Sequence, residues 1–310
     1  MTAGPQPRWV TVAAGVIRAL PAGRYLAMNW VARTPRDPFW STLPSELGGF
    51  KFRCDLRDPL MREVCFTGQY EPQETVLLRA LLGPGMTFVD VGANWGYFTL
   101  VGAHLVGQQG RVVSVEADPR ACRVVRANIA ENGLTQVVLV AAAASDRPGT
   151  LSLQAYGQSN SDSGHFGVAA STSVIEGGAR FDVPARPLEE VLRDAGVDRV
   201  DVMKMDIEGA EAKALPGLGR YLTEGRIARL ILELHPAHLR DQGGSAAAVV
   251  TDLLASGYRA WRIDQSPDAY RRAASGRLAA ERLLSPLTDV NQLGDWPHLL
   301  LTRSEHPWTT

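Results

Sequence analysis

Apolar runs of strand length alternate with helical stretches from residue 86 to near the C-terminal end of the chain. These runs show little polar alternation, which is typical of strands that helices cover on both faces. The alternation of strand and helix predicts an α/β fold with a doubly wound, mostly parallel sheet. The expected strands are Met86–Val91, Arg111–Val115, Val137–Ala143, Val200–Met205, Leu230–Leu234, Tyr258–Ile263 and His298–Thr302.

The connections between these runs carry helix and turn signals. Thr75–Leu82 is expected to form a short helix before the first strand, and residues 95–106 form the first crossover helix. Asp118 can cap the helix that follows the second strand. Thr150–Gln154 is expected to pair with the third strand as a hairpin.

Two long connections interrupt the rhythm. Residues 155–180 are rich in Gly, Ser and Ala, and residues 265–297 hold a candidate helix at 277–284 and a polar tail. Connections of this length in a compact domain are usually functional lids or disordered segments. Either could close over a ligand, and a flexible linker explains the first one equally well.

The first 70 residues lack the strand-helix pattern and are interpreted as an N-terminal extension to a domain at 71–310. A hairpin of Phe50–Asp55 with Glu63–Phe66 is expected near the end of the extension. Charged residues and a proline interrupt Trp9–Val31, so this stretch does not read as a membrane-spanning helix. We expect it to pack on the main domain or on a second subunit, which would form a homodimer.

The net charge and the cysteine content limit the classes of partner and the cellular compartment that we expect. The formal net charge of −1 gives no electrostatic footprint for nucleic acid, although a local basic groove could hide within it. The three cysteines (Cys54, Cys65 and Cys122) fit neither a zinc motif nor a disulfide framework, which favours reduced thiols. The expected protein is cytoplasmic, with a small-molecule substrate and neither nucleic acid nor membrane as a partner.

The most informative stretch is FVDVGANWGYFT, where the first strand ends in Asp90 and turns into a helix. Gly92 would let the turn approach a ligand closely, and Gly96 would let the helix sit against the sheet. A dinucleotide fold needs G-x-G-x-x-G, but the second and third glycines are replaced by Asn94 and Tyr97. The turn therefore favours a ligand without a pyrophosphate.

S-adenosylmethionine fits this pattern because it carries cationic amino and sulfonium groups and no phosphate. A carboxylate such as Asp90 can stabilise these cationic groups, directly or through water. Glu116, at the end of the second strand, can accept hydrogen bonds from both ribose hydroxyls. Together the two acids predict an adenosyl ligand.

Ionisable residues also follow two later strands. Lys204, Asp206 and Glu208 come at the end of Val200–Met205, and Glu233 and His235 at the end of Leu230–Leu234. Parallel neighbouring strands would bring these side chains to one rim. The alternative is a Lys204 salt bridge and a solvated helix start.

The other histidines lack such acidic neighbours in the sequence. We interpret them as packing or surface residues: His104, His238, His298 and His306.

These motifs resemble the FkbM-type methyltransferases, a branch of the class I S-adenosylmethionine-dependent enzymes. The resemblance covers roughly residues 65 to 302 and rests on FVDVGANWGYFTL, VEADPRACRVVRANIAENG, AAAASDRPGTLSL, KMDIEGAEAKALPGL and LILELHP. It implies a Rossmann-like sheet of seven strands whose last strand is antiparallel. The cofactor contacts it implies are Asp90, Gly92, Ala93, Asn94, Gly96, Tyr97, Phe98, Thr99, Glu116, Ala117, Ala144, Ser145 and Asp206.

The resemblance also implies O-methylation of a hydroxyl on a secondary metabolite such as a polyketide or a sugar. Competing hypotheses are transfer to an amine or carboxylate, a non-catalytic adenosyl-ligand binding protein, and a nucleotide-dependent oxidoreductase. An alcohol is a poor nucleophile, so His235 is the first candidate base, followed by Asp206 and Glu208. A divalent cation on Asp206 and Glu233 is the alternative, disfavoured because strand alternation puts Lys204 and Asp206 on one face.

Overall fold

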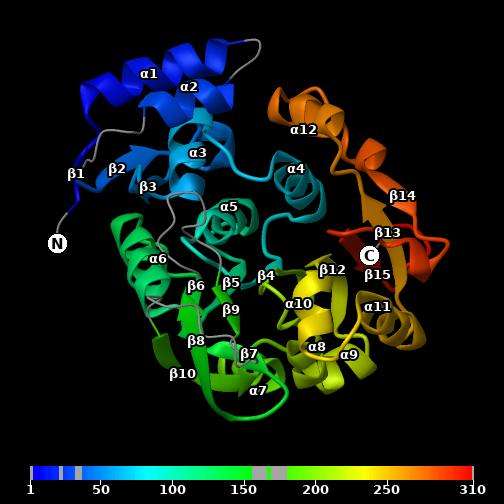
Figure 1. The fold of residues 1–310 in the computed structure, drawn as a ribbon. Coiled ribbons are helices and arrows are strands. Elements are labelled where there is room, and N and C mark those ends of the chain that lie inside the picture. The colour runs from blue at the N-terminus through cyan, green and yellow to red at the C-terminus, as the bar shows by residue number, and fades with distance from the viewer. Residues whose placement is uncertain (1–2, 21–23, 32–36, 156–165, 169–179, 309–310) are drawn as a thin grey trace.

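An eight-stranded sheet forms the centre of the protein in a computed structural model, which describes residues 3–20, 24–31, 37–155, 166–168 and 180–308. The strand order is β14-β13-β15-β12-β11-β4-β5-β6 (Figure 1). The strands are β4 (Thr87–Val91), β5 (Arg111–Glu116), β6 (Val137–Ala141), β11 (Val200–Met205), β12 (Ile227–Glu233), β13 (Arg259–Ile263), β14 (Leu284–Pro286) and β15 (His298–Thr302).

The seven expected strands are all found, with ends shifted by a few residues at most. Strands β6, β5, β4, β11 and β12 run parallel. Strand β15 is antiparallel to both of its neighbours, β12 and β13. The antiparallel final strand is therefore confirmed, and the short strand β14 adds an eighth at the edge beside β13.

Helices cover both faces of the sheet, as the apolar runs predicted. Neighbouring residues of one strand enter different cores: Phe88 lies in one and Val89 in the other, and the same holds for Val112 and Val113. Helices α4 and α5 contribute to the first core, and α7 and α11 to the second. The helices of this part are α4 (Pro72–Leu81), α5 (Tyr97–Val106), α6 (Pro119–Glu131), α7 (Leu188–Asp194), α8 (Glu211–Ala214), α9 (Arg220–Thr223), α10 (Pro236–Asp241) and α11 (Ala246–Ala255).

The N-terminal residues form a small three-stranded sheet and three helices. These elements are β1 (Gly4–Pro5), α1 (Arg8–Ala19), α2 (Arg24–Val31), β2 (Phe39–Thr42), β3 (Lys51–Cys54) and α3 (Pro59–Thr67). The expected hairpin is wrong in its second arm, because Glu63–Phe66 lies within α3 and β3 pairs with β2. Asp58 caps α3 by accepting from the backbone N–H of Met61, which is the helix signal that the strand interpretation overlooked.

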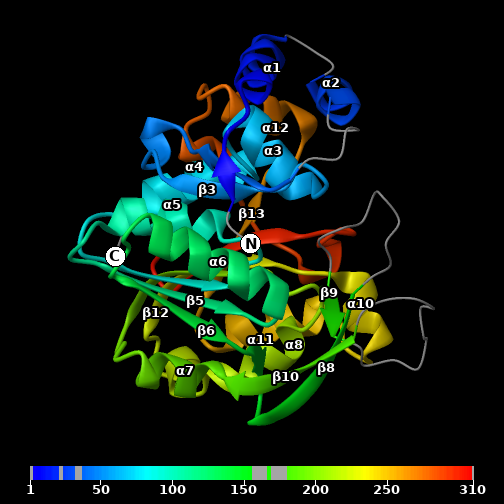
Figure 2. The ribbon, with the colours of Figure 1, turned by 90° about the vertical axis from the view of Figure 1, so that its left-hand side faces the viewer.

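The extension shares a core with the main domain. Ile17, Phe52 and Phe66 belong to the same buried cluster as Leu77 of α4 and Leu100 of α5. Figures 1 and 2 place α1, α2 and α3 at one end of the molecule and α7 and β10 at the other. The domain boundary at residue 70 stays a prediction.

Residues 143–187 contribute the strands of a second, four-stranded sheet. Its order is β7-β10-β8-β9, formed by β7 (Ala143–Ser145), β8 (Gly149–Ala155), β9 (Phe166–Val168) and β10 (Arg180–Pro187). The expected hairpin of Thr150–Gln154 with the third strand is wrong, because β8 pairs with β10 instead. Most of the 155–180 connection lies outside the described residues, and so does the lid expected there.

The 265–297 connection is largely built of short elements. It contains α12 (Pro267–Ala274), a 3-10 turn at Ala280–Leu283, strand β14 and a 3-10 turn at Val290–Gln292. The helix expected at 277–284 is thus shorter than predicted, because only the 3-10 helix at Ala280–Leu283 forms in that range, and α12 lies before it. Ser266 caps α12 by accepting from the backbone N–H of Ala269.

Candidate active site

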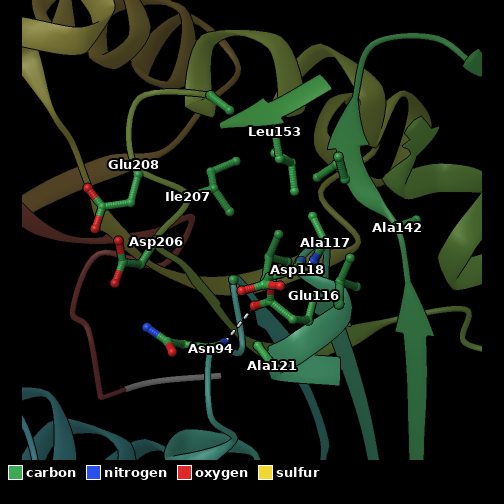
Figure 3. A pocket seen from close by; sticks show the side chains of 16 residues that line it. Asn94, Glu116, Ala117, Asp118, Ala121, Ala142, Leu153, Asp206, Ile207 and Glu208 are labelled. Carbon is green, nitrogen blue, oxygen red and sulfur yellow. Dashed lines mark hydrogen bonds between the residues drawn. The ribbon is translucent and has the colours of Figure 1, made fainter. Parts of the chain in front are cut away.

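A pocket opens at the carboxyl ends of β4, β5 and β11 (Figure 3). The carboxylates of Asp206 and Glu208 lie on one side of it, and those of Glu116 and Asp118 on the other. Leu153 of β8 completes the apolar wall. From β4 the chain winds outward through β5 and β6 and later returns to β11, so the pocket lies where the strand order reverses.

The glycine turn after β4 has a structural reason that the sequence did not reveal. Gly92 has φ +87°, and a Cβ atom there would lie 1.8 Å from the backbone oxygen of Asp206. The absence of a side chain thus lets β4 and β11 approach each other, a reason that adds to the expected close approach to a ligand, which stays a prediction. At Gly96 a Cβ would meet Val125 of α6 at 3.2 Å, so this glycine admits a neighbouring helix instead of the sheet.

Glu116 reaches into the pocket as expected and is held rigidly. Its Oε2 accepts from the backbone N–H of Asn94 at 2.6 Å. Its Oε1 accepts from the N–H groups of Ala117 and Asp118 at 2.8 and 2.7 Å. Burial raises the pKa of Glu116 to about 7, although these hydrogen bonds oppose the shift.

Asp90 lies beneath the turn and is only 1% exposed. Its Oδ2 accepts from the Thr99 hydroxyl at 2.6 Å, and that hydroxyl also lies 2.9 Å from the Ser114 hydroxyl. Burial raises the pKa of Asp90 to about 6. The carboxylate therefore fixes the start of α5 and does not line the pocket; a contact with the ligand through water stays a prediction.

The expected cofactor residues fall into two layers. Those that line the pocket are Gly92, Asn94, Glu116, Ala117, Ala144 and Asp206. The others do not line it: Asp90, Ala93, Gly96, Tyr97, Phe98 and Thr99 lie in β4, the turn and α5, and Ser145 ends β7. The lining residues that the sequence prediction missed are Val91, Val115, Asp118, Ala121, Ala142, Ala143, Leu153, Ile207 and Ala210. Asp118 and Ala121 come two and five residues after Glu116, so their position near the pocket could have been predicted. The position of Leu153 depends on the pairing of β8 with β10.

The chemistry of this pocket fits S-adenosylmethionine. Glu116 offers acceptor oxygens for ribose hydroxyls, and the alanine and leucine side chains suit an adenine ring. Asp206 Oδ1 is buried and has no hydrogen-bond partner among the described residues. An unpaired buried carboxylate oxygen favours a cationic ligand group, such as an ammonium or a sulfonium.

Glu116→Ala is expected to weaken binding of S-adenosylmethionine by about 1–3 kcal/mol, the usual cost of losing a charged hydrogen-bond partner. Asp90→Ala should weaken it within the same range, because the turn loses its anchor on Thr99. Calorimetric titration of folded variants measures both effects. Glu131→Ala, at an exposed position at the end of α6, is the control. Unchanged affinity in Glu116→Ala would contradict the placement of the ligand in this pocket.

A cluster of charged side chains lies next to the pocket, centred on Lys204. The Lys204 ammonium is 3.3 Å from Asp206 Oδ2 and 3.5 Å from Glu71 Oε2. The expected pairing of Lys204 with Asp206 is confirmed, and Glu71 is an additional partner. Burial alone would lower the pKa of Lys204, but the charges of Glu71 and Asp206 raise it well above its usual value. Lys204 is therefore a permanent cation.

His235 is held by carboxylates on both sides of its ring. Its Nδ1 lies 3.2 Å from Glu211 Oε1, and its Nε2 lies 3.2 Å from Glu208 Oε2 and 3.5 Å from Glu233 Oε1. Burial by itself lowers the pKa of His235. The hydrogen bond to Glu211 and the nearby carboxylate charges outweigh burial and raise the pKa to about 9.

Further side chains of the charged cluster are Trp296 and His238, which pack on His235, and His298. The indole N–H of Trp296 donates to Glu233 Oε1, and the two ring centroids of Trp296 and His235 are 5.4 Å apart. His238 stacks on His235 with the ring centroids 5.8 Å apart. His298 Nδ1 lies 2.7 Å from Glu74 Oε1. The expectation that His298 lacks acidic neighbours is therefore wrong, whereas His238 is a packing residue as expected.

Two groups of side chains here could hold a metal ion. In each group the ligand atoms lie within 4.8 Å of one another. One group is Asp206, Glu208 and His235, and the other is Glu71, Asp206 and Glu233. The second group contains the expected metal pair, but the Lys204 ammonium already contacts Glu71 and Asp206.

Curated relatives match short parts of the chain. A protein-L-isoaspartate O-methyltransferase from Triticum aestivum is 33% identical over 120 residues, which are 39% of this chain and 47% of that protein. A ribosomal protein L11 methyltransferase from Pelotomaculum thermopropionicum is 42% identical over 64 residues, 21% of this chain and 20% of that protein. The chain thus spans less than half the length of each of these relatives.

Solved structures with a similar arrangement include a methyltransferase FkbM from Methylobacillus flagellatus KT. It is 15% identical, covers 79% of this chain and 55% of its own, and gives a TM-score of 0.41. A SAM dependent methyltransferase from Aquifex aeolicus is 19% identical, covers 69% of this chain and 90% of its own, and gives 0.38.

A family model described as the methyltransferase FkbM domain matches residues 90–260, more than half of the chain. This range begins at Asp90 and includes Glu116, Asp206 and His235, so it contains the turn, the pocket and most of the charged cluster. The chain therefore belongs to the FkbM-domain family of methyltransferases, and its cofactor is S-adenosylmethionine.

Proposed function

We propose that the protein methylates a hydroxyl oxygen of a small molecule, such as a polyketide or a sugar. The observation that carries this proposal is the group of proton acceptors beside the cofactor pocket: Asp206, Glu208, Glu233 and His235. An aliphatic hydroxyl attacks poorly unless a base removes its proton, so such a group suits this acceptor.

The charge of the cluster disfavours a carboxylate as acceptor. The carboxylates of Asp206 and Glu208 line the pocket, and an anion 4 Å from one carboxylate is repelled by about 4 kcal/mol at an effective dielectric constant of ~20. A neutral hydroxyl avoids this repulsion. An amine is the second candidate, because the same carboxylates attract a cation.

The residues divide the work in a simple way. S-adenosylmethionine, when bound, supplies the electrophilic methyl group. Glu211 accepts a hydrogen bond from Nδ1–H of His235, which leaves Nε2 of the neutral ring as the proton acceptor. Glu208 and Glu233 then stabilise the resulting imidazolium. Trp296 positions Glu233 and forms a wall beside the ring.

We place this reaction in the cytoplasm. In support, Cys54, Cys65 and Cys122 are buried, and none of them is bridged in the part of the chain that the structure describes. Buried unbridged thiols suit a reducing compartment.

A labelled-methyl assay tests the acceptor class with three matched sets of compounds, which carry hydroxyl, amine or carboxylate groups. We expect transfer to neutral polyhydroxylated compounds, with rates at least about tenfold above those of their carboxylate analogues, as the electrostatic repulsion predicts. The carbon-13 shift of the transferred methyl group distinguishes an ether from a methylamine or an ester. Transfer only to the amine set would establish the second candidate, and preferred transfer to carboxylates would contradict the role given to the acidic cluster.

A further inference from the structure

Helices α1 and α2 leave large apolar side chains in solvent. Val12 and Val16 of α1 are 69% and 58% exposed, and Leu26 and Trp30 of α2 are 78% and 72% exposed. Each pair has the i, i+4 spacing that puts both side chains on one side of its helix. Six large hydrophobic side chains are exposed among the described residues, and these are four of them.

The exposure is not a sign that the helices are loosely attached. Val10, Ala14 and Ile17 on the other side of α1 are buried, and so is Met28 of α2. Arg18 donates from Nε to the backbone oxygen of Phe66, which ties α1 to α3. Both helices therefore use one side for the fold and leave an apolar side that no described residue covers.

The charge of this segment is entirely of one sign. Residues 1–36 contain five arginines and no aspartate, glutamate or lysine, although the whole chain has a net charge of −1. Arg8 begins α1 and is exposed, and it comes four residues before Val12, so it stands on the exposed apolar side of the helix. Arg18 and Arg24 instead donate to backbone oxygens of the chain itself. A positively charged segment whose helices expose apolar residues on one side is typical of segments that lie in the interface of an anionic membrane.

The same charge argues against a second copy of this chain. A twofold dimer would place one arginine-rich segment against its own copy, with no acidic residue in the segment to compensate. Crossing a bilayer is not supported either: the described part of the chain offers no helix with the length and apolar content required. At 12 and 8 residues, α1 and α2 measure only about 18 and 12 Å.

We propose that α1 and α2 form a docking surface for an anionic phospholipid bilayer. Val12, Val16, Leu26 and Trp30 enter the boundary between headgroups and acyl chains, and Arg8 contacts the phosphate groups. Figures 1 and 2 show these helices at one end of the molecule, so the rest of the fold can extend away from the membrane.

Vesicle flotation with the full-length protein tests this docking surface. We expect binding to phosphatidylcholine vesicles that contain about 30% phosphatidylglycerol, and at least tenfold weaker binding to pure phosphatidylcholine. In about 1 M sodium chloride, where the Debye length is ~3 Å, the binding should weaken strongly. The double variant Leu26→Ser/Trp30→Ser should lose at least about tenfold in binding.

The matched control is Leu254→Ser, which removes an exposed leucine from α11 and should bind vesicles like the wild type. Circular dichroism and the affinity for S-adenosylhomocysteine show that each variant is folded. Absence of binding to the anionic vesicles, or unchanged binding in the double variant, would overturn the proposal. So would a wild-type dimer that Leu26→Ser/Trp30→Ser separates into monomers, since a second copy would then cover the surface.

Discussion

His235→Gln is expected to lower kcat by about 10²–10⁴-fold, the usual contribution of a positioned general base, and to leave the affinity for S-adenosylhomocysteine unchanged. The ring touches Glu208, Glu211 and Glu233 and does not line the cofactor pocket, so its loss should affect the proton transfer alone. Single-turnover assays and calorimetry separate the two quantities. His104→Gln, at an exposed histidine of α5, controls for the loss of an imidazole.

The pH dependence gives this prediction a second readout. A base must be neutral to accept a proton, and the pKa of His235 is raised to about 9. kcat/KM should therefore rise with pH until about 9 and level off above it, because this parameter follows the free enzyme. The groups that face or closely surround the ring are Asp206, Glu208, Glu211, Glu233, His238 and Trp296. In His235→Gln the rise toward pH 9 should disappear.

A rise that ends near pH 7 in both proteins would point elsewhere. Burial and the charge of Asp206 raise the pKa of Glu233 to about 7, so Glu233 would then be the base. The metal alternative is separated by chelation. Under the base mechanism EDTA leaves the wild-type rate intact; a loss that magnesium restores would make Asp206 and Glu233 the ligands to test.

The strands of the large sheet could be predicted because burial on both faces leaves a continuous apolar run in the sequence. Val89, Val113 and Met203 show no exposure in the structure, and each lies in such a run. Strand β14 and helix α12 left no comparable signal. Strand β14 is three residues long and partly exposed, and α12 buries only Ala269 and Ala273.

The cofactor side of the pocket was also accessible from the sequence, since Glu116 and Asp206 stand at strand ends next to recognisable turns. The charged cluster was accessible only in part. Glu71 and Glu74 come from the start of α4, and Trp296 comes from the far end of the chain. Only the packing of α4 and the path after β14 bring these side chains to Lys204, His298 and His235.

The glycine turn shows most clearly why a motif and its physical reason are different things. Gly92 was expected to make room for a ligand, and it lines the pocket, but a Cβ atom there would first meet the backbone of Asp206 and the side chain of Ile207. Both residues line the pocket on its acidic side. A change at Gly92 that disturbs the packing of β4 against β11 is therefore expected to move Asp206 and Ile207 and to change the shape of the pocket.

Gly92→Ala is accordingly expected to lower the free energy of unfolding by about 2–5 kcal/mol. Of this, ~1–2 kcal/mol comes from an alanine in the left-handed region at φ +87°. A further ~1–3 kcal/mol comes from overpacking, because the new Cβ would lie 1.8 Å from a backbone oxygen that no rotamer change can move. Asp206 must then shift, so the affinity for S-adenosylhomocysteine should fall as well.

Gly85→Ala separates the clash from the backbone strain. Gly85 has φ +83°, close to that of Gly92, but a Cβ atom there would meet nothing within 4 Å. This control should lose only ~1–2 kcal/mol and keep its affinity for S-adenosylhomocysteine. Urea denaturation and calorimetry measure the two quantities for both variants. If Gly92→Ala proves as stable as Gly85→Ala and binds equally well, β4 and β11 are not packed as tightly as the structure shows, and neither the sheet nor the ligand needs a glycine at this position.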